Sequence, residues 1–214
     1  MTGFKRRPGD LGWLVLGAVV LVVSALPVRP AYAPALEARL FDLVNHAPDL
    51  PFTVVWVPMQ LGNFLVVPVA VVVALAVGWR RWRVALELAL AGGGVYLLAK
   101  QVKHFVQRGR PATVLDGVII RGAEPHGLGF VSGHVAVVTT LAFVAWPWLP
   151  RWARWLVALA VAVVCLARMY VGAHLPLDIS GGAGLGLATG ALARLLLGAR
   201  SEAGRLPARS VRSA

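Results

Sequence analysis

The sequence predicts an all-α membrane protein: a bundle of six transmembrane helices with a short interfacial helix after the first span. Two observations lead to this prediction. Hydrophobic residues make up 58% of the 214 residues and charged residues only 14%, which is too apolar for a soluble domain. In addition, six apolar runs are long enough, or nearly so, to cross a hydrocarbon core that requires about 20 helical residues. The runs cover residues 11–27, 54–77, 84–102, 134–148, 155–170 and 179–197.

The two ends of the chain flank one membrane domain. We assign residues 1–10 to a basic cytoplasmic N-terminus, residues 11–198 to the six-span domain and residues 199–214 to a cytoplasmic tail. The first run follows Lys5-Arg6-Arg7 and no convincing small-residue cleavage site comes after it, so we expect it to be retained as a signal anchor. The tail is small, polar and basic, which predicts disorder close to anionic lipid.

Residues 34–45, between the first and second runs, are expected to form the interfacial helix. At helical spacing its apolar and charged residues occupy opposite faces: Leu36, Leu40, Leu43 and Val44 on one, and Glu37, Arg39 and Asp42 on the other. Amphipathic segments of this kind lie at a membrane surface. The helix either covers the bundle or gates the passage of a lipid, and the sequence leaves both open. We interpret His46, at its end, as an interfacial polar residue.

Small and aromatic residues in the later runs predict how the helices pack. Gly182, Gly186 and Gly190 recur every four residues, which creates a smooth strip that another helix can approach closely. The three glycines at 92–94 are expected to act similarly in the third run. Tryptophans gather at the ends of runs on one side, where indole rings prefer the headgroup zone: Trp79, Trp82, Trp146, Trp148, Trp152 and Trp155. The single cysteine, Cys165, lies inside a run and is expected to be a small buried hydrophobe, so no intramolecular disulfide forms.

The basic residues predict the orientation. The formal net charge is +12, but these residues lie mainly between apolar runs, which indicates membrane topology rather than a nucleic-acid partner. Thirteen Lys and Arg residues fall on the side of the termini and eight on the other. By the positive-inside rule both termini are cytoplasmic in a plasma membrane and the other side faces outward. The outward segment 112–131 is rich in glycine and is expected to be irregular, with Asp116, Glu124 and His126 solvated.

Three groups of polar residues interrupt the apolar pattern, all on the outward side. They are Lys103 with Arg110-Pro111, Ser132-Gly133-His134, and Arg168 with His174 and Asp178. If a helix begins after Leu175, with Pro176 tolerated in its first turn, then His174 and Asp178 lie on one face. The carboxylate can then hold one ring nitrogen and leave the other free to attack. Three cations and a hydroxyl-glycine turn suit phosphoryl chemistry.

In the form K-x6-R-P, S-G-H and R-x5-H-x3-D, these groups resemble the signature of the type 2 phosphatidic acid phosphatase superfamily, the membrane relatives of vanadium haloperoxidases. Each group alone is a weak signal, but their order, spacing and position at the edges of apolar runs are specific. The resemblance covers about residues 50–195. It implies that His174 attacks phosphorus to give a phosphohistidine and that Asp178 fixes its tautomer. It also implies that His134 protonates the leaving group and later activates water.

The same resemblance assigns phosphate binding to five residues: Lys103, Arg110, Ser132, Gly133 and Arg168. Arginine suits bidentate contact with phosphate oxygens, whereas lysine acts as a point charge. No set of metal ligands is visible and no cofactor is expected, so side chains must carry the charge. His104 has no place in the motif, and we interpret it as a structural or rim residue.

Two positions depart from the family pattern. Members commonly have Pro before S-G-H, where this chain has Val131, and Ser before the arginine of the last group, where it has Ala167. Neither position supplies the nucleophile, the acid or the cations. Loss of the proline could loosen the turn that presents Ser132, and loss of the hydroxyl could remove one hydrogen bond. A lower rate or an altered substrate preference would follow.

We therefore predict a metal-independent membrane phosphatase that hydrolyses a lipid phosphate or diphosphate, phosphatidate-type or polyprenyl-type, on the outer face of a plasma membrane. The sequence does not choose the lipid or the oligomeric state. Three alternatives remain: a phosphotransferase that passes the phosphoryl group from His174 to another acceptor, a transporter with a polar pathway, and polar residues that only stabilise the bundle. A haloperoxidase is disfavoured because those relatives are soluble.

Overall fold

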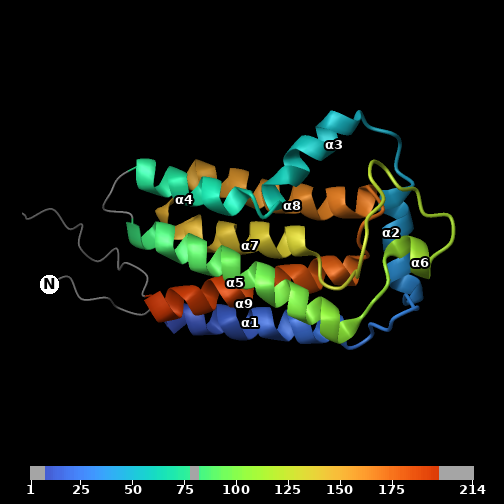
Figure 1. Cartoon of the computed structure of the whole chain (residues 1–214), viewed down its shortest axis with the longest axis horizontal. Coiled ribbons are helices and arrows are strands. Elements are labelled where there is room, and N and C mark those ends of the chain that lie inside the picture. Colours follow the sequence, from blue (N-terminus) through green and yellow to red (C-terminus); the bar gives the residue numbers. More distant parts are fainter. Residues whose placement is uncertain (1–7, 78–81, 198–214) are drawn as a thin grey trace, which may run out of the picture.

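The computed structural model describes residues 8–77 and 82–197 (Figure 1). Within these ranges the chain is helical, apart from turns, irregular loops and one isolated bridge between Arg29 and Tyr32. This confirms the predicted all-α class. The basic residues 1–7 and the tail from residue 198 lie outside the described ranges, as does Trp79.

Five long helices run lengthwise beside one another and match five of the predicted runs (Figure 1). They are α1 (Pro8–Ala25), α5 (Trp82–Val106), α7 (Gly133–Ala145), α8 (Arg151–Tyr170) and α9 (Pro176–Leu197). The last of these, α9, packs against α1, α7 and α5, so it lies at the centre of the bundle. The predicted helix after Leu175 is confirmed, with Pro176 as its first residue.

Three of the described helices are long and apolar enough to cross a membrane: Trp82–Val114, Arg151–Tyr170 and Pro176–Leu197. A fourth crossing is obtained if the bent pair Phe52–Gly62 and Val66–Ala76 counts as one span. The apolar helices of α1 and α7 are shorter. The chain therefore has the helices of a membrane protein, and the count of six spans stays a prediction.

The second predicted run is not one continuous helix. It forms α3 (Phe52–Met59), the 3-10 helix η1 (Gln60–Gly62) and α4 (Val66–Ala76), with a bend of 69°. Asn63 adopts an extended conformation, and its side-chain Oδ1 accepts a hydrogen bond from the Leu65 N–H at 3.0 Å, which starts the next helix. A Cβ on Gly62 would lie 2.7 Å from His134 Cβ, so glycine allows the bend to press against the start of α7.

The glycine strip of α9 is confirmed as a packing surface. A Cβ on Gly182 or Gly186 would lie 2.6 Å from the carbonyl oxygens of Ser132 and Ala136, both on the α7 side. On the opposite face, a Cβ on Gly184 would lie 2.6 Å from the Leu21 nitrogen of α1. In α5 the expectation holds only for the first of the three glycines at 92–94, which packs on Val67 of α4.

We expect Gly186→Val to lower the free energy of unfolding by about 3 kcal/mol, because the new side chain meets backbone that cannot move aside. The matched control is Gly93→Ala, where no atom lies within 4 Å of the added Cβ. That change should be neutral or stabilise the helix by up to about 1 kcal/mol. Thermal unfolding of both variants in detergent is the measurement, and equal midpoints would contradict the packing argument.

The interfacial helix, α2 (Ala35–Asn45), stands across one end of the bundle (Figure 1). The predicted division into an apolar and a charged face holds only in part, because Arg39 and Asp42 are exposed but Glu37 is buried. Leu36 and Leu43 are 70% and 75% exposed, whereas Glu37 is only 4% exposed and packs inward together with Phe41 and Asn45. The apolar face therefore points away from the protein, and selected polar side chains point into it.

The segment 112–131 lies at the same end and is irregular, as predicted, after the short helix α6 (Pro111–Val114). Two side chains hold it in place. The Asn45 amide donates to the carbonyls of Ile119 and Tyr170 at 2.9 and 3.1 Å. Arg121 donates to the carbonyls of Asn45 and Tyr170 at 2.7 and 2.9 Å. Asp116, Glu124 and His126 are exposed, consistent with a solvated loop.

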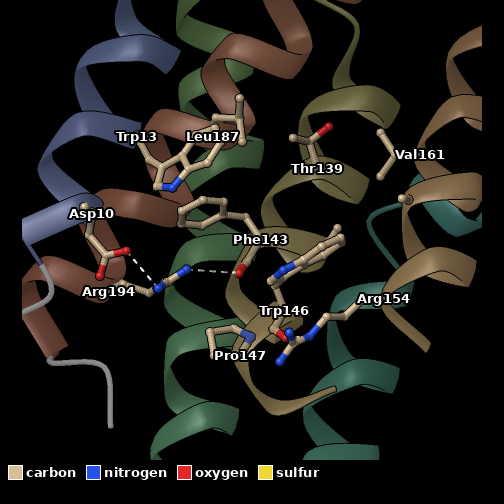
Figure 2. Close-up of a pocket in the computed structure, with 13 residues that line it drawn as sticks. Asp10, Trp13, Thr139, Phe143, Trp146, Pro147, Arg154, Val161, Leu187 and Arg194 are labelled. Atoms are coloured by element: carbon tan, nitrogen blue, oxygen red, sulfur yellow. Dashed lines mark hydrogen bonds and ion pairs between the residues drawn. The ribbon is translucent and has the colours of Figure 1, made fainter. Parts of the chain in front are cut away.

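A cavity of about 640 Å³ lies at the other end of the bundle, between α1, α7, α8 and α9 (Figure 2). A buried ion pair borders it: Arg194 Nη2 and Asp10 Oδ1 are 2.8 Å apart, and the Arg194 guanidinium lies 4.6 Å from the centre of the Phe143 ring. None of the predicted site residues lines this cavity.

Candidate active site

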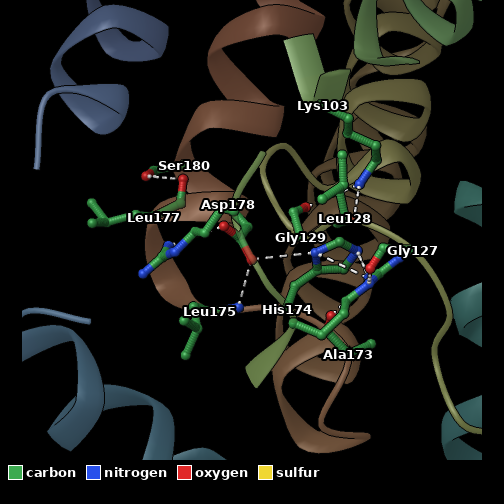
Figure 3. Close-up of polar contacts among 12 residues, drawn as sticks. Lys103, Gly127, Leu128, Gly129, Ala173, His174, Leu175, Leu177, Asp178 and Ser180 are labelled. Carbon is green, nitrogen blue, oxygen red and sulfur yellow. Dashed lines mark hydrogen bonds and ion pairs between the residues drawn. The ribbon is translucent and has the colours of Figure 1, made fainter. Parts of the chain in front are cut away.

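His174 lies in the short segment between α8 and α9 and is 2% exposed. Asp178 is in the first turn of α9, and its Oδ2 is 3.4 Å from His174 Nδ1 (Figure 3). The same oxygen accepts the Leu175 N–H at 3.0 Å, which fixes the carboxylate against the segment that carries the histidine. The predicted pairing of these two side chains is confirmed.

The opposite ring nitrogen of His174 faces a cation. Its Nε2 lies 2.9 Å from Arg110 Nη1 (Figure 3). The same Arg110 nitrogen is also 3.5 Å from Nδ1, so this contact does not fix the tautomer by itself. The ionised Asp178 carboxylate can only accept a hydrogen bond, and it lies beside Nδ1. The proton of the neutral ring then sits on Nδ1, toward Asp178. This tautomer is the one that a nucleophilic Nε2 requires.

The three predicted cations come from three different elements. Lys103 is in the last turn of α5, Arg110 directly precedes α6, and Arg168 is in the last turn of α8. Backbone carbonyls hold two of them. Lys103 Nζ donates to Leu128 and Gly129 at 2.7 and 3.0 Å, and Arg110 donates to Ala173 at 2.8 Å. The cations are therefore anchored where α5, α8 and the segment 112–131 meet.

Ser132-Gly133-His134 forms the N-terminus of α7, with Ser132 as the N-cap residue. The Ser132 N–H donates to the Asp178 carbonyl at 2.9 Å, which joins this turn to the start of α9. Among the described residues, Ser132 Oγ and Arg168 Nε are buried without a hydrogen-bond partner. Such donors, together with the first N–H groups of a helix, which have no partner within it, are suited to an oxyanion.

Burial and the nearby cations together determine the pKa of His174. Burial lowers the pKa of His174 well below its usual value, and the charges of Arg168, Arg110 and Lys103, then His134, lower it further. Burial disfavours the charged imidazolium and nearby cations disfavour it again. His174 is consequently neutral at physiological pH, the protonation state that a nucleophile needs.

This lowered pKa makes the fold sensitive to acid. Below pH 6.5 the unfolded chain binds a proton at residue 174 that the folded protein does not, so stability falls as the pH decreases. We expect a slope of up to about 1.4 kcal/mol per pH unit from this residue. Thermal unfolding between pH 7.5 and 5 should have a shallower pH dependence in His174→Asn. The control His104→Asn, at an exposed position, should keep the wild-type slope.

A family model of the PAP2 superfamily matches residues 80–202, more than half of the chain. The chain belongs to the PAP2 superfamily. The matched region includes every predicted catalytic and phosphate-binding residue of this superfamily member. The resemblance found in the three motifs is thus confirmed at the level of the family.

Similarities to individual proteins are consistent with membership of the PAP2 superfamily. A curated undecaprenyl-diphosphatase from Sulfolobus acidocaldarius is 26% identical over 150 residues, which cover 68% of this chain and 71% of the relative. The crystal structure of Aquifex aeolicus LpxE has a TM-score of 0.67 and 26% identity, covering 75% of this chain and 95% of that one. A PAP2-type phosphatidylglycerolphosphate phosphatase from Bacillus subtilis has the same fold, with a TM-score of 0.66, 20% identity and coverage of 86% and 94%.

Two buried residues next to this PAP2 site are not among the predicted site residues. Arg108 is 0% exposed, and it bridges Glu37 and Asp178. From the sequence, Arg108 is only one of the outward basic residues, and Glu37 is only one of three charged residues in the segment 34–45. The available signal was the spacing of Glu37, Phe41 and Asn45, which puts these three residues on one face of α2.

Other histidines do not join the site. His46 is exposed and lies 4.0 Å from Asp42, and His104 is exposed at the end of α5. Across residues 8–77 and 82–197, no group of three or more His, Cys, Asp or Glu side chains is placed to hold a metal ion.

Proposed function

We propose that this protein is an integral membrane phosphatase that hydrolyses a lipid phosphate or diphosphate through a phosphohistidine on His174. The observation that carries the proposal is the environment of His174 Nε2. The nitrogen belongs to a buried neutral imidazole whose other nitrogen faces Asp178, and it lies 2.9 Å from Arg110 Nη1. A nucleophile among cations is what attack on a phosphate dianion demands, because the cations offset its charge.

The cations would bind the transferring phosphoryl group. Arg110 and Arg168 suit bidentate contact with its oxygens, and Lys103 supplies a further positive charge. Ser132 Oγ and the Gly133 N–H complete the cradle at the start of α7. Side chains and backbone thus carry the charge of the transition state, and we propose that no metal ion is required.

The reaction has two displacements. His174 Nε2 bonds to phosphorus as the bond from phosphorus to the leaving oxygen breaks, and that oxygen takes a proton from His134. Asp178 stabilises the positive charge that develops on the imidazole. The neutral His134 then accepts a proton from water, whose oxygen attacks phosphorus and breaks the bond to His174. Orthophosphate is released in both cases. The first leaving group is the lipid alcohol for a monophosphate substrate and the lipid monophosphate for a diphosphate substrate.

An apolar cavity of about 320 Å³ supports a lipid substrate. It lies between α4, α5, α7 and α8 and is lined almost entirely by valine, alanine and leucine. Its end at Leu61 adjoins Gly62, which packs against His134. A hydrocarbon chain placed there would leave its phosphate headgroup near the cations. The names of the relatives agree with such substrates, since they include an undecaprenyl-diphosphatase and a phosphatidylglycerolphosphate phosphatase.

We further propose six crossings, with α1 and α7 as short spans and the bent pair α3 and α4 as one. Both termini are cytoplasmic in this arrangement, and the site faces outward from the plasma membrane. Cysteines introduced at Asp116 and at Arg151, with Cys165 replaced by Ala, test this orientation. An impermeant maleimide should label position 116 in intact cells and position 151 only after lysis; the reverse pattern would contradict it.

The function is tested with purified protein in mixed micelles. We expect orthophosphate release from at least one member of a panel containing phosphatidate, phosphatidylglycerol phosphate and a polyprenyl diphosphate, in the presence of EDTA and with inhibition by orthovanadate. Activity that requires an added metal would contradict the metal-independent part. Transfer of the phosphoryl group to an acceptor lipid in place of water would identify a phosphotransferase.

A further inference from the structure

Arg108 and Glu37 form a buried charge cluster with Asp178. Arg108 Nη1 donates to Glu37 Oε1 at 2.9 Å and to Asp178 Oδ1 at 3.0 Å, while Nη2 contacts the second Glu37 oxygen and the Tyr32 carbonyl. All three side chains are at most 4% exposed. A bidentate pair of this kind is rigid as well as strong, because two parallel hydrogen bonds fix the plane of the guanidinium.

Asp178 lies between Arg108 and His174. Its Oδ1 accepts from Arg108, and its Oδ2 faces His174 Nδ1 and accepts the Leu175 N–H. The two oxygens therefore have separate tasks, and rotation of the carboxylate would break contacts on both sides. Arg108 itself has no access to a substrate, because both terminal nitrogens are occupied and the side chain is fully buried.

Glu37 also fixes the helix that carries Asp178. Its Oε1 accepts the Leu177 N–H at 2.8 Å, one of the N–H groups in the first turn of α9 that have no partner within the helix. A carboxylate at a helix N-terminus is favoured by the helix dipole as well. Glu37 thus connects α2, which stands across the end of the bundle, to the first turn of the catalytic helix.

The net charge of the cluster suits the positive charge that develops on His174 during the reaction. Arg108 alone would cancel the charge of Asp178 and leave nothing for the imidazolium that forms when His174 attacks. Glu37 restores a net charge of minus one, which balances the positive imidazolium ring of the phosphohistidine. Without Arg108, two buried carboxylates would repel each other, and one would take up a proton.

Resting on the proposed function, we propose that Glu37 and Arg108 are positioning residues for the Asp178–His174 pair. Arg108 orients the carboxylate, and Glu37 keeps the cluster negatively charged while it holds the start of α9. Glu37 lies outside residues 80–202, so the PAP2 family model does not include it. The role predicts a specific kinetic effect: the chemical step slows while phosphate binding is preserved.

The test uses the full chain in detergent, with p-nitrophenyl phosphate as substrate and orthovanadate as the phosphate mimic. Glu37→Gln keeps the shape and the acceptor oxygen but removes the charge; we expect kcat to fall about 10- to 100-fold, the usual effect of removing a partner that orients a functional side chain. KM and the inhibition constant of vanadate should stay within about threefold. Glu37→Asp, which restores the charge, should recover part of kcat. The matched control is Asp42→Asn on the exposed face of α2, which should leave kcat unchanged.

Two double variants separate positioning from folding. Glu37→Gln combined with Arg108→Gln removes both charges, leaves Asp178 as the single charge, and should be more active than Arg108→Gln alone. In an Asp178→Asn background, Glu37→Gln should have less than a threefold effect, because residues that act through one group are not additive. If Arg108→Gln does not fold, the isosteric variant Glu37→Gln and the charge-restoring variant Glu37→Asp still test the inference.

If Glu37→Gln has the same kcat as Asp42→Asn while His174→Ala abolishes turnover, the positioning role is wrong and the proposed function stands. A vanadate inhibition constant that rises in step with the loss of kcat would also overturn it, since that pattern belongs to a phosphate-binding role. Undiminished turnover in His174→Ala would overturn the proposed function and the inference with it.

Discussion

His174→Ala is expected to lower turnover by at least about 10⁴-fold and to abolish a covalent phosphoenzyme. Removal of a nucleophile eliminates the two-step route, and the binding residues alone leave only a small residual acceleration. We propose this role for residue 174 because its Nε2 lies 2.9 Å from Arg110 Nη1 while its Nδ1 faces Asp178. The loss should appear in kcat, with vanadate binding retained, because all three cations remain.

The measurement is a rapid quench of wild-type protein with a substrate carrying ³²P in the transferred group. Label should be attached to the protein, stable in alkali and lost in acid, as expected for a phosphoramidate bond to histidine. Its stoichiometry should approach one per active site. Asp116→Asn, in the exposed loop, is the control and should trap label like the wild type. Label on another residue, or normal turnover without residue 174, would refute the assignment.

The pairing of His174 with Asp178 was predictable because their spacing has a direct geometric meaning. His174 and Asp178 are one helical turn apart, and Pro176 marks the start of the helix that holds them together. The glycine strip was predictable for the same reason, since every fourth residue of a helix falls on one face. The spacing of Lys103 and Arg110 indicates which end of the bundle they occupy, although their carbonyl partners in the segment 112–131 follow no pattern in the sequence.

The orientation of α2 and the break in the second run were not predictable in this way. Helical periodicity places Glu37, Phe41 and Asn45 along one side of the helix, away from Leu36 and Leu43, but it does not say which side meets the protein. At a membrane surface the leucines lower the free energy by facing lipid, which leaves the side of Glu37 for the bundle, while Arg39 and Asp42 stay exposed. Glu37 is stable inside only because Arg108 is already there, a contact between residues 71 positions apart. The bend after Gly62 depends likewise on the close approach of His134.

His134→Ala is expected to separate the two displacements. For a lipid phosphate the departing alkoxide needs a proton, so loss of the acid should lower kcat by about 10²- to 10⁴-fold. p-Nitrophenyl phosphate releases a stable phenolate that needs no acid, so its first step should proceed at close to the wild-type rate. The second step still requires a base to activate water. Stopped-flow absorbance should therefore record a burst of about one nitrophenolate per protein, followed by slow turnover.

The substitution preserves the packing of α7 on Gly62, because alanine keeps the Cβ of residue 134 and removes only the ring. The matched control is His104→Ala, a second histidine at the same end of the bundle but exposed, which should have no burst and wild-type rates. Added imidazole should accelerate the slow phase of His134→Ala by serving as an external base. If the aryl substrate slowed as much as the lipid and no burst formed, His134 would be acting in binding and not in proton transfer. The phosphoenzyme would then need a different base for its hydrolysis, and the N–H groups in the first turn of α7 would be left as the main contribution of Ser132-Gly133-His134.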